Sequence, residues 1–190
     1  MNSSSAVQRS LRRLKPEKHT SSLRPRDRSS LSFLDPIRQP SHKLLLDTTV
    51  YIDALQSRLP QSADLVIPAS EIWHSTVTES ELAALLGLLN PRHKDSPQAI
   101  KQVVAVLENR PAHRTLNPDA EVWREAGILA GMLARLQGYG NTERRRALND
   151  ALILLSAAKK GCTVLTRNVA DFDFLMQLAP FGKVLFYDIS

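Results

Sequence analysis

The sequence predicts an α/β fold in which a parallel sheet is covered by helices on both faces. Two observations lead to this prediction. Short apolar runs, such as residues 44–46, alternate along the chain with longer segments whose apolar residues recur at helical spacing. A short run without a polar face is typical of a strand buried on both faces of a parallel sheet. Strands that alternate with helices are joined by right-handed crossovers, which place helices on the two faces.

Strands are expected where short apolar or β-branched runs are bounded by polar residues. The first such run follows Lys43 and consists of three leucines that end at Asp47. Another, at 163–166, is rich in β-branched residues and comes directly after a glycine. The full set of expected strands is 44–46, 65–67, 71–77, 163–166 and 184–187.

Helices are expected where apolar residues recur with a period of 3.6 between recognisable caps. Thr78 and Glu81 have the spacing of a capping box, so a helix is expected to begin at Thr78. Serine before Pro97 and asparagine before Pro118 each resemble an N-cap followed by proline at the first helical position. Gly161 follows two lysines and is typical of a helix terminator. The expected helices are 48–57, 78–89, 97–108, 118–137, 142–160 and 171–178.

The first 42 residues are expected to form a disordered basic arm, followed by one folded domain at 43–190. The arm is rich in Ser, Arg and Pro, and its few apolar residues are scattered, which predicts too little burial to offset the entropy of ordering. The chain has a formal charge of +6, and residues 1–43 account for all of it, because they carry ten Lys or Arg and only three acids, a net of +7. The expected domain is therefore nearly neutral.

The composition limits the compartment and excludes several classes of protein. Cys162 is the only cysteine, so no disulfide can form within the chain, and a reducing, cytoplasmic location fits best. No apolar run approaches the roughly 18 residues that a membrane-spanning helix needs. The beginning of the chain lacks the apolar stretch of a secretory signal, although its Ser and Arg content leaves an organellar transit peptide as an alternative.

Acidic residues occur at the positions where expected strands end. Asp47 ends the first strand, Asp171 follows the strand 163–166, and Glu81 lies early in the helix after the second strand. Ligands of parallel sheets bind beyond the carboxyl ends of the strands, so these three side chains are expected at one edge. Asp150 lies within a helix and joins them only if that helix crosses the same edge.

Four neighbouring carboxylates predict a bound divalent cation. Each pair about 5 Å apart would repel by on the order of 3 kcal/mol at an effective dielectric near 20. A cation removes this cost, and all-oxygen ligation favours Mg²⁺ or Mn²⁺ over Zn²⁺. Such an ion activates water and neutralises charge on a phosphate, which predicts hydrolysis of a phosphodiester.

Four segments carry a specific resemblance. The segments 44–53, 75–82, 149–153 and 166–172 are similar, in order and separation, to the successive motifs of the PIN-domain family, especially the VapC-type toxins of bacterial toxin–antitoxin pairs. The resemblance extends over essentially everything from Lys43 onward. The basic arm departs from the pattern, because such toxins usually begin almost at the first strand.

The resemblance implies a three-layer α/β/α sandwich and Mg²⁺-dependent endonuclease cleavage of RNA by a metal-activated water. By position, Asp47 and Asp150 would be the central metal ligands, Glu81 a third ligand, and Asp171 a fourth that acts directly or through water. Thr166 and Asn168 would orient the ligands or the attacking water. The family also implies a homodimer and inhibition by a small antitoxin.

Structural explanations stand beside the functional ones. Asp47 and Asp171 could simply cap the helices that follow them, and the capping box could account for Glu81. Asp150 is hardest to explain structurally, since aspartate has poor propensity for a helix interior. The arginines at 144–146 are as well explained by solvation as by RNA binding.

Further residues are expected to have packing roles. The spacing of Gly127 and Gly131 suits the close approach of another helix. Trp73 and Trp123 are expected in the core or at a dimer contact rather than as platforms for bases. The histidines are scattered along the sequence, so no histidine general base is suggested.

Three other functions compete with a ribonuclease. The first is a catalytically silent PIN-like module that binds RNA or protein. The second is a phosphatase with an aspartyl nucleophile, but Thr49 stands where such enzymes need a second aspartate. The third, a P-loop nucleotide enzyme, lacks its glycine-rich loop.

Overall fold

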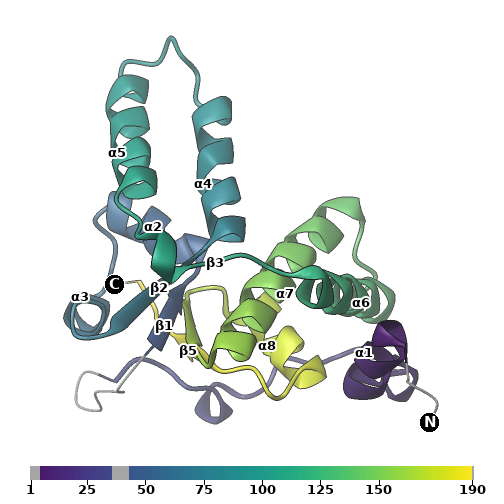
Figure 1. Ribbon diagram of the computed structural model, residues 1–190. Helices are drawn as coiled ribbons and strands as arrows, with labels where there is room; N and C mark the ends of the chain where they lie inside the picture. The colour runs from purple at the N-terminus through teal and green to yellow at the C-terminus, as the bar shows by residue number, and fades with distance from the viewer. Residues whose placement is uncertain (1–4, 36–42, 190) are drawn as a thin grey trace.

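The computed structural model describes residues 5–35 and 43–189, and its centre is a five-stranded, entirely parallel sheet (Figure 1). The strands lie in the order β3-β2-β1-β4-β5. Their bounds are β1 Lys43–Leu46, β2 Glu71–Ser75, β3 Thr115–Leu116, β4 Thr163–Thr166 and β5 Val184–Phe186. The prediction of an α/β fold with a parallel sheet is confirmed.

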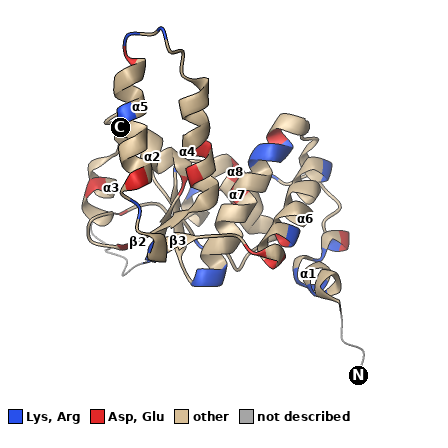
Figure 2. Cartoon of the chain, turned by 45° about the horizontal axis from the view of Figure 1, so that its top comes forward, with Lys and Arg blue, Asp and Glu red and all other residues tan. Residues whose placement is uncertain are grey.

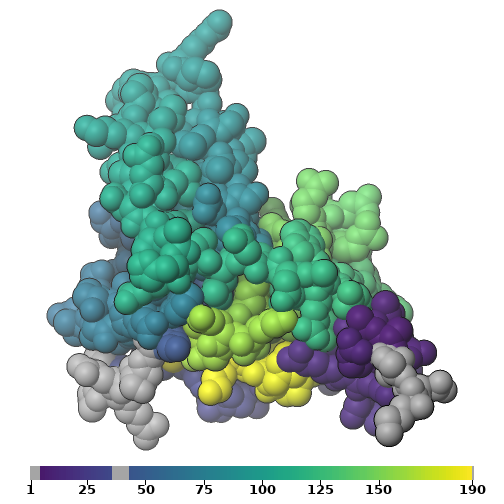
Figure 3. Space-filling view, in the orientation of Figure 1, coloured from purple at the N-terminus to yellow at the C-terminus, as the bar shows by residue number. Residues whose placement is uncertain are grey.

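Helices pack against both faces of the sheet. One face is covered by α2 Thr48–Leu55, α3 Gln61–Val66 and α4 Thr76–Leu88, and α5 Ser96–Glu108 packs against α4. The other is covered by α6 Ala120–Gln137, α7 Asn141–Lys160, α8 Val169–Leu178 and, at its margin, α1 Ala6–Leu14. Figures 1 and 3 show α4 and α5 projecting together beyond the rest of the molecule.

The strands alternate between these two cores. Leu45 and Val164 face the layer of α6, α7 and α8, whereas Leu44, Leu46 and Leu165 face the layer of α2 and α4. All five side chains are at most 6% exposed. Leucine runs without a polar face are therefore explained by burial on both sides.

One expected strand is absent, and one observed strand was not expected. Leu65 and Val66 end α3, and Ile67 is its C-cap, so no strand forms here. Ala63 and Val66 are buried and Leu65 is 58% exposed, which is the spacing of a helix. The two-residue strand β3 was not predicted, because so short a segment has no periodicity to detect. It adds an edge to the sheet by pairing with β2.

The capping box expected at Thr78 is absent, because α4 begins two residues earlier. Ser75 is the N-cap, and its hydroxyl accepts a hydrogen bond from the Val77 amide at 3.1 Å. Thr78 is a buried residue of the helix whose hydroxyl points to the Leu46 carbonyl oxygen. Glu81 consequently lies in the second turn of α4, and no cap accounts for it.

Other helix ends differ from the expected caps by one to three residues. The N-caps are Asp95 for α5, Asp119 for α6 and Asn168 for α8, in place of Ser96, Asn117 and Asp171. Gly161 ends α7 with a φ of 73°, the left-handed conformation expected of a terminator. Several cap-forming residues occur in a row at these ends, and tertiary packing selects one of them.

The expectation of a disordered arm was wrong for its described part, residues 5–35; residues 1–4 and 36–42 lie outside the described residues. α1 packs on α6, with Leu14 1% exposed inside the core. Leu31 and Phe33 pack against the same core. Average composition failed because these few apolar residues fall where the segment meets the domain.

Ion pairs and backbone bonds also attach this N-terminal segment, residues 5–35, which Figures 1 and 3 show in purple along one side of the molecule. Arg26 pairs with buried Asp173, and Arg13 pairs with buried Glu125. The Phe186 amide donates to the Ser32 carbonyl at 2.8 Å, which extends the margin of β5. Arg13 and Arg26 therefore have fixed partners in the domain.

Within the described ranges, no helix has both the length and the apolar character needed to cross a membrane.

The division of the chain into an arm of residues 1–42 and a domain of residues 43–190 stays a prediction.

Candidate functional site

The carboxyl edge of the sheet gathers acidic side chains from four elements. Asp47 directly follows β1 and caps α2, and Asp171 lies in the first turn of α8, just after β4. Glu81 is in the second turn of α4, which follows β2 without a loop. Asp150 lies in the middle of α7, the helix that packs between α4 and α8.

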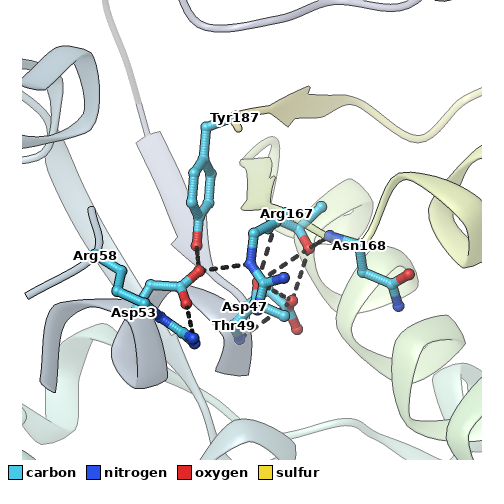
Figure 4. Close-up of polar contacts among 8 residues, drawn as sticks. Asp47, Thr49, Asp53, Arg58, Arg167, Asn168 and Tyr187 are labelled. Carbon is cyan, nitrogen blue, oxygen red and sulfur yellow. Dashed lines mark hydrogen bonds and ion pairs between the residues drawn. The ribbon is translucent and has the colours of Figure 1, made fainter. Parts of the chain in front are cut away.

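Asp47 is held by two threonine hydroxyls. Thr49 and Thr166 donate to its Oδ2 at 2.8 and 2.7 Å. Each hydroxyl also accepts a backbone amide of the loop after β4, Thr49 from Arg167 at 3.1 Å and Thr166 from Asn168 at 2.9 Å (Figure 4). Since both threonine donors bind Oδ2, Oδ1 is the oxygen without a hydroxyl donor.

Asn168 connects two more of the acids. Its side-chain Nδ2 donates to Asp150 Oδ2 at 3.2 Å and to Asp171 Oδ2 at 3.0 Å. Tyr139 adds a bond from its hydroxyl to the other oxygen of Asp171 at 3.3 Å. One amide nitrogen thus lies within hydrogen-bond reach of both carboxylates.

Glu81 is fixed by neighbours of the other acids. Its Oε2 accepts a hydrogen bond from Thr48, which follows Asp47, and its Oε1 accepts one from Asn149 Nδ2 at 2.6 Å. Asn149 directly precedes Asp150. The six residues singled out in the sequence, Asp47, Glu81, Asp150, Asp171, Thr166 and Asn168, therefore lie together.

Burial and mutual repulsion perturb the acids. Burial raises the pKa of Asp47, which is 3% exposed. The pKa of Asp150 lies well above its ordinary value, first because the residue is buried and then because the negative charges of Asp47, Asp171 and Glu81 surround it. Arg146 opposes this shift only in part. The other three carboxylates therefore disfavour the charged form of Asp150.

The donor set fits a hard divalent cation, although the ligands do not converge. In the part of the chain that the structure describes, no three His, Cys, Asp or Glu side chains come together as a ready metal cage. The carboxylates instead bind Thr166, Asn168 and Asn149. Carboxylate oxygens in excess of nearby cations are nevertheless the chemistry that Mg²⁺ and Mn²⁺ prefer.

A second network lies beside the acids and was missed from the sequence. Asp53 is fully buried. Its carboxylate accepts hydrogen bonds from Arg58 Nη2 at 2.9 Å, from Arg167 Nε at 2.7 Å and from the Tyr187 hydroxyl at 2.9 Å (Figure 4). Arg167 also donates its amide to Thr49, so the network adjoins the shell of Asp47. Its sequence signal was an aspartate two turns into an apolar helix, within the first motif segment.

Replacing Asp53 with Asn is expected to lower the free energy of unfolding by about 2–3 kcal/mol, because two guanidinium groups lose their buried counter-charge. Thermal unfolding followed by circular dichroism measures the effect. The matched control is Asp64→Asn, at an exposed position of α3. Equal melting temperatures for the two variants would contradict the expectation.

The far side of α2 carries a buried cation. The Arg110 guanidinium lies over the Tyr51 ring, with 4.5 Å between its Cζ and the ring centroid. The three guanidinium nitrogens have no hydrogen-bond partner among the described residues. Tyr51 bonds His74 Nδ1 at 2.5 Å. Burial and then the charges of Arg110 and Arg114 lower the pKa of His74 to about 4, so this histidine is neutral at pH 7.

The remaining sequence expectations have mixed outcomes. Trp73 is buried as expected, whereas Trp123 is 51% exposed on the surface of α6. Gly127 and Gly131 face open space rather than another helix of the described chain. The arginines at 144–146 are exposed at the start of α7, which Figure 2 shows in blue, apart from the acids at the base of α4.

The fold and the carboxylate cluster define an α/β domain with an acidic site at the carboxyl edge of a parallel sheet. Residues 44–173 match the family model of the PIN domain. Because this match spans more than half of the chain, the chain belongs to the PIN-domain family, whose members are typically metal-dependent nucleases.

Solved structures share the fold at low sequence identity. FitAcB from Neisseria gonorrhoeae has a TM-score of 0.54 and 20% identity, with 75% of this chain and 96% of that chain covered. VapBC2 from Rickettsia felis, bound to a DNA fragment from its promoter, has a TM-score of 0.52 and 19% identity, and the match covers 77% of this chain and 98% of that chain. VapBC-1 from nontypeable Haemophilus influenzae has a TM-score of 0.51 and 22% identity, and the match covers 77% of this chain and 97% of that chain. A search of curated proteins gave no match.

Proposed function

We propose that this chain is a Mg²⁺-dependent endoribonuclease that cleaves RNA phosphodiester bonds with a metal-activated water. The observation that carries the proposal is the gathering of four acidic side chains, Asp47, Glu81, Asp150 and Asp171, at the carboxyl edge of the sheet, where the other three surround the buried Asp150. Such a cluster costs stability without a cation, and proteins keep strained charge of this kind at functional sites. Membership of the PIN-domain family supports the same reading.

In this proposal Asp47 and Asp150 hold the cation, with Glu81 and Asp171 as further ligands. When bound, a Mg²⁺ ion would supply a water of lowered pKa and positive charge for the phosphate. Thr49 and Thr166 orient Asp47 by fixing its Oδ2. Asn168 orients Asp150 and Asp171 through one amide nitrogen.

The partners follow from the family and the structural neighbours. The VapBC and FitAB neighbours are toxin–antitoxin complexes, so we propose a small cognate antitoxin as a partner. We further propose that the chain acts as a homodimer in the cytoplasm. Co-purification with the product of an adjacent small reading frame would support the antitoxin.

The test is cleavage of single-stranded RNA by the purified full chain. We expect cleavage with Mg²⁺ or Mn²⁺, and at least a hundredfold lower rate in EDTA, on the order of the loss from one main electrostatic contribution. Restoring Mg²⁺ in excess of EDTA should restore the rate, which separates metal removal from unfolding. Equal cleavage in Mg²⁺ and EDTA would overturn the metal-dependent mechanism.

A second candidate is a catalytically silent PIN-like module that binds RNA or protein. It is favoured by one observation: in the described ranges the carboxylates bind protein amides and hydroxyls, and no three of them converge. Calorimetric titration with Mn²⁺ separates the two. Saturable binding that Asp150→Asn removes supports the nuclease, and the absence of heat supports the silent module.

A further inference from the structure

A cavity with an aromatic wall adjoins the acidic site. Its volume is about 250 Å³, and it lies where the start of α4 meets the loop after β3, the first turn of α6 and the middle of α7. The lining residues are Thr76, Val77, Ser80, Asn117, Pro118, Trp123, Asn149 and Leu152. None of them is charged.

Trp123 forms an exposed part of this wall. It lies in the first turn of α6, where the preceding residue, Val122, is 4% exposed and packs in the core. Trp123 itself is 51% exposed, whereas the other tryptophan of the chain, Trp73, is 7% exposed. A half-exposed indole beside a cavity offers a flat apolar surface to a ligand.

Asn149 belongs to both the cavity and the acidic site. Its Nδ2 donates to Glu81 at 2.6 Å, and the next residue along α7 is Asp150. Ser80, another lining residue, directly precedes Glu81. A group in the cavity would therefore lie next to a chain bound at the carboxylates.

The lining chemistry selects the kind of ligand. A phosphate would need cations, and the lining provides none. Aromatic surface, amide groups and hydroxyls are the combination that binds a nucleobase, since its faces stack and its edges form hydrogen bonds. The cavity is also smaller than the roughly 300–1,000 Å³ of sites for drug-sized ligands.

We propose that this cavity binds one unpaired nucleobase of the RNA, next to the bond that is cut. The base stacks on Trp123, and the amides of Asn117 and Asn149 contact its edge. This site gives the enzyme its preference for a base near the cut and for single-stranded RNA. The inference rests on the proposed ribonuclease function.

The first experiment measures cleavage of a single-stranded RNA by the full chain with Mg²⁺. Trp123→Ala is expected to lower kcat/KM by roughly ten- to a hundredfold, the usual loss when one base–aromatic stack is removed. Trp123→Phe should recover most of that loss, because phenylalanine retains a stacking face. The matched control is Leu65→Ala, an exposed apolar residue of α3 outside the cavity, which should cleave like the unsubstituted chain.

The second experiment measures binding without cleavage. In an Asp47→Asn background, short single-stranded RNA should quench tryptophan fluorescence, and the quenching should vanish when Trp123→Phe is added. Trp73 is present in both proteins and provides the constant background. Asn117→Ala should leave the quenching but flatten the preference among RNAs that differ at one base near the cut.

The outcomes separate this inference from the proposed function. Full cleavage by Trp123→Ala, or equal quenching with and without Trp123, overturns the base site while the ribonuclease stands. No RNA cleavage by the unsubstituted chain overturns the ribonuclease and the base site together. Loss of cleavage in Trp123→Ala with unchanged thermal unfolding, rescued by Trp123→Phe, supports the base site.

Discussion

Asp150→Asn is expected to abolish Mg²⁺-dependent RNA cleavage, with a loss of about a thousandfold or more in rate, and Asp47→Asn should do the same. Each substitution keeps the size of the side chain but removes a proposed ligand charge. The amide also presents a donor toward Asn168 or Thr166, where the carboxylate accepted. Cleavage of a labelled RNA measures the loss.

Asp150→Asn should also stabilise the metal-free protein. The pKa of Asp150 is raised in the folded state, so the charged form is disfavoured by folding. Stability therefore falls as pH rises from the ordinary carboxyl pKa through the raised one. In EDTA at pH 7, Asp150→Asn should raise the free energy of unfolding by on the order of 1 kcal/mol, or about 2–4 °C in Tm.

These two readouts together distinguish a lost site from a lost fold. A variant that melts higher in EDTA yet does not cleave has lost the site alone. Added Mg²⁺ should raise the Tm of the unsubstituted chain more than that of Asp150→Asn, because a ligand stabilises only the state that binds it. The matched control, Asp64→Asn on α3, should cleave and melt like the unsubstituted chain. Undiminished cleavage by both Asp47→Asn and Asp150→Asn would refute the site.

Deleting the N-terminal segment through residue 35 is expected to cost several kcal/mol, a large part of the 5–15 kcal/mol that stabilises a typical domain. The deletion removes Leu14 and Phe33 from the core and the backbone bonds to Phe186 at the margin of the sheet. It also leaves Asp173 and Glu125, 2% and 3% exposed, without their arginines. A buried carboxylate that loses its partner is strongly destabilising.

Thermal unfolding and the soluble yield of the truncated chain measure this effect. We expect a Tm lower by about 10 °C or more, or the loss of a cooperative transition. Arg26→Ala isolates one contact and should show a smaller decrease. Arg24→Ala is the matched control, since among the described residues Arg24 bonds the domain through its backbone carbonyl, which the substitution keeps. A truncated chain as stable as the full one would show that the segment contributes nothing to folding.

The amino-acid sequence by itself determined the fold class and the edge at which the acids lie. Both depend on local rules. A leucine run without a polar face, such as residues 44–46, indicates a buried parallel strand, and the residue after such a strand lies at the carboxyl edge of the sheet. The order of the motif segments indicated the PIN-domain family, which the match at 44–173 confirms. The strand at 163–166 was predicted at its observed bounds.

Only the tertiary structure decided the contacts between distant segments. It showed that α7 brings Asp150 to Asn168, that Asp53 is held by Arg58, Arg167 and Tyr187, and that the N-terminal segment packs on α6. It also showed that Trp123 faces a cavity rather than the core. Periodicity and caps depend on neighbours within one or two turns, whereas contacts of this kind join residues that are far apart in the chain, such as Arg26 and Asp173, 147 positions apart. The energies of these contacts depend on which side chains are in contact in the folded chain, and average composition does not specify those contacts.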